Sequence, residues 1–302
     1  MTRIRQTWEN FGIFEKGDFG KMGLYGENNK QGQYWNEQPG QSWVIHDAAM
    51  NERLQTISDI LFEDLEVLEC KNGLDIGCGA GSTTRRLYKT LSKKGNVTGL
   101  DISGKLLEVA RSHSESNGLH FLQADAQSYA FDREVFDVVI SRFGVMFFEN
   151  PLKAFQNIKS AIQPGREMRF VCWAPMAAND FFISPLKTVV DITGVSFAEP
   201  GREPGPLAFS DRTYLSSILQ EAEFSSVNID VVETSINTRD SVEQNAALLM
   251  EIGMGFRAIK EADPSDEILS EIRQAFINDG NKRLENGVIS YDATIYRVSA
   301  KI

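Results

Sequence analysis

The spacing of apolar and polar positions along the chain predicts an α/β protein. From about residue 41 to 66, apolar side chains recur at helical spacing. From residue 71 onward, short apolar runs alternate with helical segments. The expected strands lie at 71–76, 96–101, 120–123, 136–141 and 168–173. This alternation predicts a doubly wound, mostly parallel sheet with right-handed crossovers and helices on both faces.

The alternation ends after Trp173, where we expect a lid. Residues 176–209 combine an apolar helix with a loop rich in glycine and proline. Further along we expect a helix at 211–224, a strand at 227–232, helices at about 241–261 and 264–285, and a last strand at 288–298 that pairs antiparallel with the sixth. Ser103 and Asp211 are expected helix N-caps, because their side-chain oxygens accept hydrogen bonds from free backbone N–H groups.

Four segments follow from this reading. Residues 1–68 form an N-terminal arm and helical cap, and 69–174 form a Rossmann-like core. Residues 175–210 form the lid insertion, and 211–302 complete the sheet and carry an inserted pair of helices. The helices at 241–285 suit either a dimer interface or packing within the chain, so a monomer and a homodimer both remain open.

Composition and charge narrow the classes of function. The chain has 302 residues, 42% of them hydrophobic, and a formal net charge of -11. Such an acidic protein repels phosphate backbones and anionic lipids, so we expect neither a nucleic-acid nor a membrane partner. The three cysteines follow no metal or disulfide spacing, and the sequence shows no signal peptide and no apolar run of membrane-spanning length. We therefore expect a cytoplasmic protein without a metal.

The strongest candidate for a binding site is the run Leu74-Asp75-Ile76-Gly77-Cys78-Gly79-Ala80-Gly81-Ser82. It joins a strand to a helix, where open α/β sheets bind ligands. The dinucleotide fingerprint has glycine or alanine where this chain has Ser82. The negative charge of Asp75 would repel a pyrophosphate. It would attract a cationic ligand, such as the ammonium and sulfonium groups of S-adenosylmethionine.

Acidic residues end the next strands where that ligand needs them. Asp101, followed by Ile102, is placed to accept hydrogen bonds from both ribose hydroxyls. Asp125 is placed to accept from the adenine amino group, while an adjacent backbone N–H, as at Ala126, reaches a ring nitrogen. The carbonyl of Ser141, at the end of the fourth strand, is placed to hold the amino-acid end.

At these positions the chain resembles the class I S-adenosylmethionine-dependent methyltransferases, over about residues 71–174 and more loosely in the final hairpin. Leu74–Gly81 is similar to the first motif of the family, Leu100-Asp101-Ile102 to the acidic end of its second strand, and Ala124-Asp125-Ala126 to its adenine-binding motif. Ser141–Phe148, Pro151–Phe155 and Ile162–Gly165 resemble the ubiquinone-biosynthesis-like branch. Arg166 departs from the glycine that many relatives have after Pro-Gly, and this affects only a turn.

The resemblance implies a Rossmann-like sheet of seven strands with an antiparallel last strand. It also implies an enzyme (EC 2.1.1.-) that moves a methyl group from S-adenosylmethionine to a small molecule and releases S-adenosylhomocysteine. The expected cofactor-binding residues are Asp75, Gly77, Cys78, Gly79, Asp101, Ile102, Asp125, Ala126, Ser141 and Trp43.

Aromatic residues are the main candidates for the acceptor site. Tyr25, Tyr34, Trp35 and Trp43 either cover the cleft or anchor the N-terminal arm. Phe143, Met146, Phe147 and Trp173, at the ends of strands four and five, either line the acceptor pocket or pack in the core. Arg142 either binds a carboxylate of the acceptor or pairs with a local acid.

A general base is hard to find in the sequence. Of the three histidines, His113 and His120 fall at structural positions, and His46, in the cap, is the remaining candidate. Acceptors with a neutral nitrogen or sulfur nucleophile need less help from a base than a hydroxyl, so they are favoured, with oxygen and carbon acceptors still open. A nicotinamide-dependent oxidoreductase, a non-catalytic S-adenosylmethionine-binding protein and a methyltransferase acting on protein or RNA are the alternatives.

Overall fold

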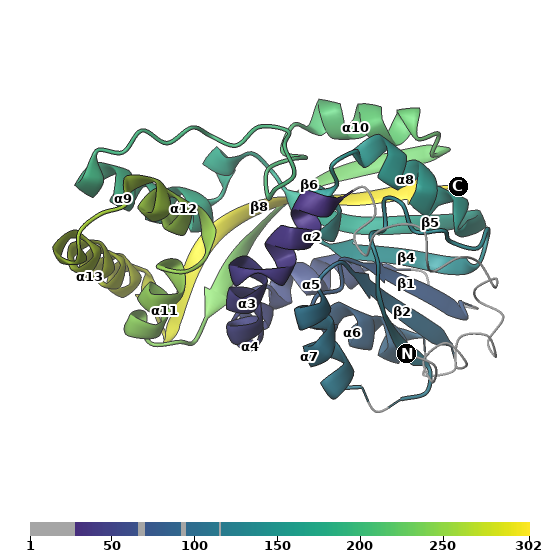
Figure 1. Ribbon diagram of the computed structural model, residues 1–302, viewed down its shortest axis with the longest axis horizontal. Coiled ribbons are helices and arrows are strands. Elements are labelled where there is room, and N and C mark those ends of the chain that lie inside the picture. Colours follow the sequence, from purple (N-terminus) through teal and green to yellow (C-terminus); the bar gives the residue numbers. More distant parts are fainter. Residues whose placement is uncertain (1–27, 66–69, 92–94, 115) are drawn as a thin grey trace.

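A computed structural model describes residues 28–65, 70–91, 95–114 and 116–302. Its centre is a sheet with the order β3-β2-β1-β4-β5-β8-β6, and the short strand β7 pairs with β8 (Figure 1). The strands are β1 (Asn72–Ile76), β2 (Asn96–Asp101), β3 (Leu119–Gln123), β4 (Phe136–Arg142), β5 (Ile162–Trp173), β6 (Ser226–Thr238), β7 (Leu284–Glu285) and β8 (Val288–Lys301). Strands β1 to β5 pair in parallel.

The C-terminal strand gives the sheet its antiparallel half. β8 pairs antiparallel with β5 on one side and with β6 on the other. The fold class predicted from the sequence is therefore confirmed, and the two-residue strand β7 is an addition to the seven strands expected. β6 and β8 are longer than the expected strands because their pairing continues to Thr238, opposite Ile289.

Helices cover both faces of the sheet, as the alternating pattern predicted. α6 (Ser82–Thr90) and α7 (Gly104–Ser112) lie on one side, and α8 (Pro151–Ser160) and α10 (Arg212–Glu221) lie on the other (Figure 1). Ser103 accepts a hydrogen bond from the Leu106 N–H, and Asp211 accepts from two N–H groups at the start of α10. Both predicted N-caps are confirmed.

The cap differs from the expected single helix at 41–66. α2 (Asn29–Asn36) is followed by three short helices, α3 (Gln38–Ile45), α4 (Asp47–Arg53) and α5 (Gln55–Phe62). The chain changes direction at His46 and Leu54, where ψ is near 10°. Each short helix can thus turn its own apolar side chains toward the sheet, and Leu54, Ile57 and Leu61 are buried there.

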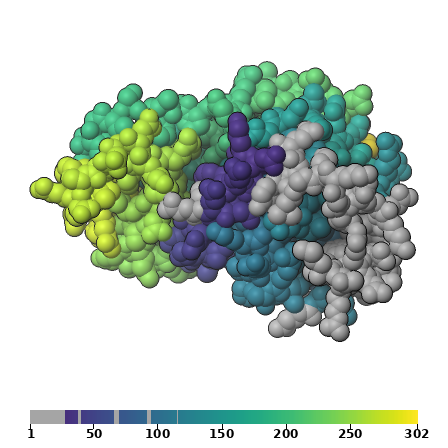
Figure 2. All heavy atoms as spheres, in the orientation of Figure 1, coloured from purple at the N-terminus to yellow at the C-terminus, as the bar shows by residue number. Residues whose placement is uncertain are grey.

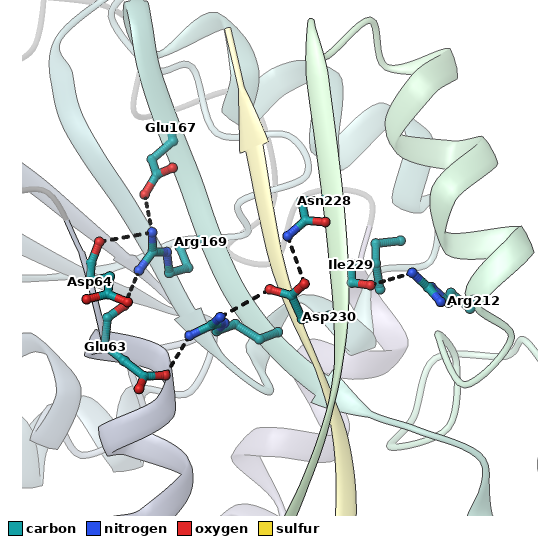
Figure 3. Close-up of polar contacts among 9 residues, drawn as sticks. Glu63, Asp64, Glu167, Arg169, Arg212, Asn228, Ile229 and Asp230 are labelled. Carbon is teal, nitrogen blue, oxygen red and sulfur yellow. Dashed lines mark hydrogen bonds and ion pairs between the residues drawn. The ribbon is translucent and has the colours of Figure 1, made fainter.

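A polar network connects the end of α5 to β5 and β8, and through β8 to β6 (Figure 3). Arg169 of β5 donates to the backbone carbonyl of Glu63, and Arg297 of β8 donates to the Glu63 carboxylate at 2.7 Å. Arg297 also bonds Asp230, its direct cross-strand partner on β6, at 3.2 Å. The cap is therefore tied to the antiparallel half of the sheet as well as to the parallel half.

The lid is built from two separate parts of the chain. After the short turn η2 (Met176–Ala178), α9 (Asp180–Thr193) packs against α12 (Gly253–Ala262) and α13 (Asp266–Arg283), and α11 (Val242–Leu249) completes the cluster (Figure 1). The expected helix at 241–261 is interrupted between α11, which ends at Leu249, and α12, which begins at Gly253 with a φ of +91°. In Figure 2 the purple cap lies between this yellow-green cluster and the blue-green core.

Within the described residues, no helix is both long enough and apolar enough to cross a membrane.

Candidate functional site

A cavity of about 750 Å³ lies at the carboxyl ends of the parallel strands, under the cap and the lid. It is lined by residues from the ends of β1 to β5, from α2 to α4, and from α9 and α12. The sequence-predicted residues that line it are Gly77, Cys78, Gly79, Asp101, Ile102, Asp125, Ala126 and Trp43, together with Tyr34, Trp35, Arg142, Phe143, Met146, Phe147 and Trp173. Tyr25 lies outside the described residues.

The glycine-rich loop forms one wall of the cavity. The N–H groups of Gly77 and Cys78 donate to the Leu100 carbonyl, which ties the loop to β2. A Cβ atom on Gly79 would have no heavy atom within 4 Å, so this residue leaves open space where a side chain would project. The loop therefore offers bare backbone to a ligand.

Asp101 braces this loop from the end of β2. Its two carboxylate oxygens accept hydrogen bonds from the backbone N–H groups of Gly79 (2.7 Å) and Ser103 (2.8 Å). Burial raises the pKa of the Asp101 carboxyl. Each carboxylate oxygen has a second lone pair, so Asp101 can still accept hydrogen bonds from a ligand in the cavity.

Asp125 is held by its own loop after β3. Its oxygens accept from the backbone N–H of Gln127 at 3.0 Å and from the hydroxyl of Ser128 at 2.7 Å. Asp125, Ala126 and Ile102 line the same cavity. The structure thus brings the ends of β2 and β3 together as the sequence predicted, and their roles toward adenosine stay predictions.

Asp75 and Ser141 do not line the cavity and act on the loop from beneath. One carboxylate oxygen of Asp75 accepts from the hydroxyls of Thr83 and Thr84, both at 2.7 Å. Its other oxygen is buried and has no hydrogen-bond partner among the described residues. Burial raises the pKa of Asp75 to about 6. The Ser141 hydroxyl donates to the Ile76 carbonyl at 2.7 Å, and a direct contact of either residue with the cofactor stays a prediction.

Aromatic residues of the cap form the roof. The ring of Trp35 lies 6.1 Å from that of Trp43 and 5.1 Å from that of Phe147, measured between centroids. The Trp35 carbonyl accepts a hydrogen bond from the Ser103 hydroxyl at 2.8 Å. The Asn36 amide group bonds the carbonyl of Ile102 and the N–H of Gly104. These contacts hold α2 over the end of β2, beside Asp101.

The other end of the cavity is aromatic and apolar. The rings of Phe143 and Trp173 stack with centroids 4.3 Å apart and planes 8° apart. Phe143 has a φ of 66°, a strained conformation for a residue with a side chain, and such strain often occurs at binding sites. The sequence analysis missed several residues that lie here, which come from the lid and α12: Phe181, Phe182, Phe197, Met254 and Phe256. No local motif marks them, because only the packing of α9 on α12 brings them to the cavity.

Arg142 lies where the cavity meets the cap. Its guanidinium donates to the Ser58 hydroxyl and to the Asn51 side-chain carbonyl, each at 2.7 Å, and to the Ser82 hydroxyl at 3.2 Å. Within the described residues no carboxylate lies within ion-pair distance of Arg142, but Asp75 and Asp47 are close enough for their negative charges to favour its charged form. Burial lowers the pKa of Arg142 to about 10.

His46 and His113 both lie outside the lining of the cavity. His46 does not line the cavity, but its Nε2 lies 2.8 Å from the carboxylate of Glu251, which does. His113 is exposed at the end of α7. Among residues 28–302, apart from the segments left undescribed, no group of three His, Cys, Asp or Glu side chains is arranged to hold a metal ion.

Comparison with known proteins gives a domain match for the part of the chain that contains the glycine loop. Residues 74–169 match the family model described as a methyltransferase domain. The chain is 32% identical over 99 residues to the ubiquinone/menaquinone biosynthesis C-methyltransferase UbiE of Wigglesworthia glossinidia brevipalpis, an alignment that covers 32% of this chain and 40% of the relative. It is 26% identical over 180 residues to the demethylmenaquinone methyltransferase of Staphylococcus haemolyticus, covering 56% of this chain and 74% of that protein.

A solved structure supports the fold. The BH2331 protein of Bacillus halodurans C-125 superposes with a TM-score of 0.50 and 17% sequence identity, over 82% of this chain and 99% of that one. At this identity the similarity concerns the fold alone. Residues 74–169, which contain the glycine loop and the acidic strand ends, thus match a methyltransferase domain, and the chain is similar to ubiquinone/menaquinone and demethylmenaquinone methyltransferases.

Proposed function

We propose that the whole chain transfers the methyl group of S-adenosylmethionine to a small-molecule acceptor with a large apolar or aromatic surface. The observation that carries this proposal is the single cavity that joins the glycine loop, Asp101 and Asp125 to the aromatic end around Phe143 and Trp173. Both reactants of a methyl transfer need such a shared, enclosed space. S-Adenosylhomocysteine would be the product that remains with the protein.

The residues present fit S-adenosylmethionine. Gly79 leaves open space at the loop, and the carboxylates of Asp75, Asp101 and Asp125 favour a ligand with positive charge and hydroxyl or amino donors. The order β3-β2-β1-β4 would place adenine near Asp125, ribose near Asp101 and the amino-acid end near β1 and β4. This orientation directs the sulfur toward the Phe143 end of the cavity.

When bound, S-adenosylmethionine supplies a methyl group made electrophilic by its positive sulfur. The protein would align the acceptor atom with the methyl group and exclude water from the cavity. The cap residues Trp35 and Trp43 cover the cavity from one side, and the lid residues Phe182 and Phe197 cover it from another. The stacked rings of Phe143 and Trp173 offer a flat surface against which an acceptor ring can pack.

The side chains that line the cavity indicate which kinds of acceptor atom the protein could methylate. Among the described lining residues there is no histidine, and the carboxylates that face the cavity include Asp47 and Glu251. An acceptor with a neutral nitrogen or sulfur nucleophile needs no strong base, and it is the first choice, followed by oxygen. His46 can assist only through Glu251, which separates it from the cavity. One relative is named a C-methyltransferase, so the test includes activated ring carbons.

The test begins with calorimetric titration of the protein with S-adenosylhomocysteine, with NAD as the parallel control. We expect micromolar binding of the former and none of the latter. The second step is incubation with radiolabelled S-adenosylmethionine and panels of amines, thioethers, phenols and hydroquinones, with S-adenosylhomocysteine release as the readout. Binding of NAD alone would favour the oxidoreductase alternative, and binding without release on any acceptor would favour a non-catalytic binding protein.

The proposal also covers the cellular location of the protein, its partners and its oligomeric state. We place it in the cytoplasm, without a nucleic-acid or membrane partner, as a monomer or homodimer. Its segments would act as an arm and cap (1–68), a cofactor-binding core (69–174), a lid (175–210) and a C-terminal part (211–302) that shares in the lid. Sedimentation velocity of the purified protein, with and without S-adenosylhomocysteine, distinguishes the two oligomeric states.

A further inference from the structure

Arg142 is a cation that lines the cavity, and in the described structure its hydrogen-bond partners are all neutral, while Asp75 and Asp47 act on it only from beyond ion-pair distance. Its guanidinium is oriented by the hydroxyls of Ser58 and Ser82 and by the side-chain carbonyl of Asn51. Buried charges in proteins are normally paired, because the loss of hydration is otherwise not compensated. A guanidinium has more N–H donors than these three bonds use, so Arg142 can still bind an anion from the cavity.

The place of Arg142 in the sheet indicates which anion this is. Arg142 ends β4, which lies two strands from β2 in the order β2-β1-β4. Neighbouring strands are about 4.8 Å apart, so the ends of β2 and β4 are separated by about 10 Å. Asp101 marks the ribose position at the end of β2, and the glycine loop lies between the two. A cofactor that lies across these strand ends brings its methionine half toward Arg142.

The neighbours of Arg142 belong to the same end of the cofactor site. Ser82 is the first residue of α6, directly after the glycine loop, and Asn51 lies on α4 of the cap. Asn51 accepts from both Ser82 (2.8 Å) and Arg142 (2.7 Å), so loop, cap and β4 meet at this point. The guanidinium is therefore held in one orientation before a ligand arrives, which lowers the entropy lost on binding.

We propose that Arg142 binds the α-carboxylate of the methionine half of S-adenosylmethionine, and that Ser58, Asn51 and Ser82 position its guanidinium for that contact. This inference rests on the proposed function. It replaces the acceptor carboxylate considered from the sequence with a cofactor carboxylate. A carboxylate on the acceptor is the other source of the same chemistry, and the experiment separates the two.

The experiment compares two ligands that differ in the carboxylate-bearing part. S-Adenosylhomocysteine contains the amino-acid end, and 5′-methylthioadenosine has the same adenosine and sulfur without it. Calorimetry is performed with the unaltered protein, Arg142→Gln and Arg142→Lys, with Arg202→Gln as the matched control because Arg202 is exposed and pairs with Asp211 outside the cavity. We expect Arg142→Gln to weaken S-adenosylhomocysteine binding about 10- to 100-fold, with 5′-methylthioadenosine unchanged. Arg142→Lys should lose less, because it keeps the charge.

Each other result overturns the inference in a distinct way. An equal loss for both ligands would mean that Arg142 only supports the fold of the site. Unchanged affinity for S-adenosylhomocysteine, with a raised KM for a carboxylate-bearing acceptor, would assign Arg142 to the acceptor. If Arg142→Gln does not fold, Arg142→Lys carries the same comparison. Failure of the unaltered protein to bind S-adenosylhomocysteine would instead contradict the proposed function, so the two failures are distinguishable.

Discussion

Gly77 and Gly144 pack backbone against backbone, where the loop after β1 meets the turn after β4. A Cβ atom on Gly77 would lie 2.5 Å from the Cα of Gly144, and a Cβ on Gly144 would lie 2.7 Å from the Cα of Gly77. Neither residue can carry a side chain without moving the other. This contact holds the two loops together at the cavity, and it joins the glycine loop to the aromatic turn that contains Phe143.

The first prediction concerns this contact. Gly77→Ala should lower the free energy of unfolding by more than about 2 kcal/mol, because it combines strain at a positive φ with a backbone clash. Gly79→Ala is the matched control, since Gly79 also has a positive φ but open space around its Cβ. It should cost only about 1 kcal/mol. Urea unfolding measures the free energy of unfolding of both variants. Equal losses would show that the close approach of Gly77 and Gly144 does not add to the cost of a side chain at residue 77.

The second prediction tests Asp101. Asp101→Asn should weaken binding of S-adenosylhomocysteine and of 5′-methylthioadenosine alike, by about 10- to 100-fold, because the ribose is common to both ligands. This equal loss contrasts with the ligand-selective effect expected at Arg142. Calorimetry with Glu221→Gln, an exposed substitution on α10, supplies the control. Unchanged affinity in Asp101→Asn would remove this residue from the ribose site.

The third prediction follows from the raised pKa of Asp75. Because burial raises this pKa to about 6 in the folded protein, the folded state binds more protons than the unfolded state between about pH 4 and pH 6. The contribution of Asp75 to stability is therefore present below about pH 4 and is lost as the pH rises through 6. At about 1.36 kcal/mol per pKa unit the change amounts to about 3 kcal/mol.

The measurement for Asp75 is the unfolding free energy as a function of pH, from urea titrations of the unaltered protein and Asp75→Asn. We expect the difference between the two to shift in favour of Asp75→Asn as the pH rises from 4 to 7. Asparagine keeps an acceptor for Thr83 and Thr84 and carries no charge to desolvate. A difference that stays constant over this range would contradict the assignment of this titration to Asp75.

The fourth prediction concerns the link between cap and lid. Arg53 on α4 is 1% exposed, pairs with Asp240 at 2.8 Å, and donates to Asn245, which in turn donates to the hydroxyl of Tyr291. Arg53→Met should destabilise the protein by about 3 kcal/mol, because it leaves buried partners without a donor. The exposed pair of Arg202 and Asp211 is the comparison. Arg202→Met should cost less than about 1 kcal/mol in the same thermal or urea unfolding experiment.

Local signals in the sequence were sufficient to predict the sheet core and the end of the cavity that contains Asp101 and Asp125. The N-caps at Ser103 and Asp211 depend on the residue itself and the next three positions, so they are readable from the sequence. The positions of Asp101 and Asp125 beside one cavity can be predicted from the sequence for a related reason. In a parallel sheet all carboxyl ends meet at one edge, and residues far apart in the sequence thus come together by rule.

The lid, and the role of residues such as Arg142, depended on contacts that no local pattern encodes. α9 and α12 are separated by α10, β6 and α11 in the sequence, yet they pack together and bring Phe182 and Met254 to one cavity. The same holds for Asn51 and Ser58, whose hydrogen bonds orient Arg142 from helices predicted as one continuous segment. The sequence by itself determined the fold class, the glycine loop and the acidic strand ends, because these follow from local periodicity and sheet topology. The tertiary structure decided which side chains enclose the apolar end of the cavity and which oxygens surround Arg142, because such contacts form only when distant helices bury their apolar faces against each other.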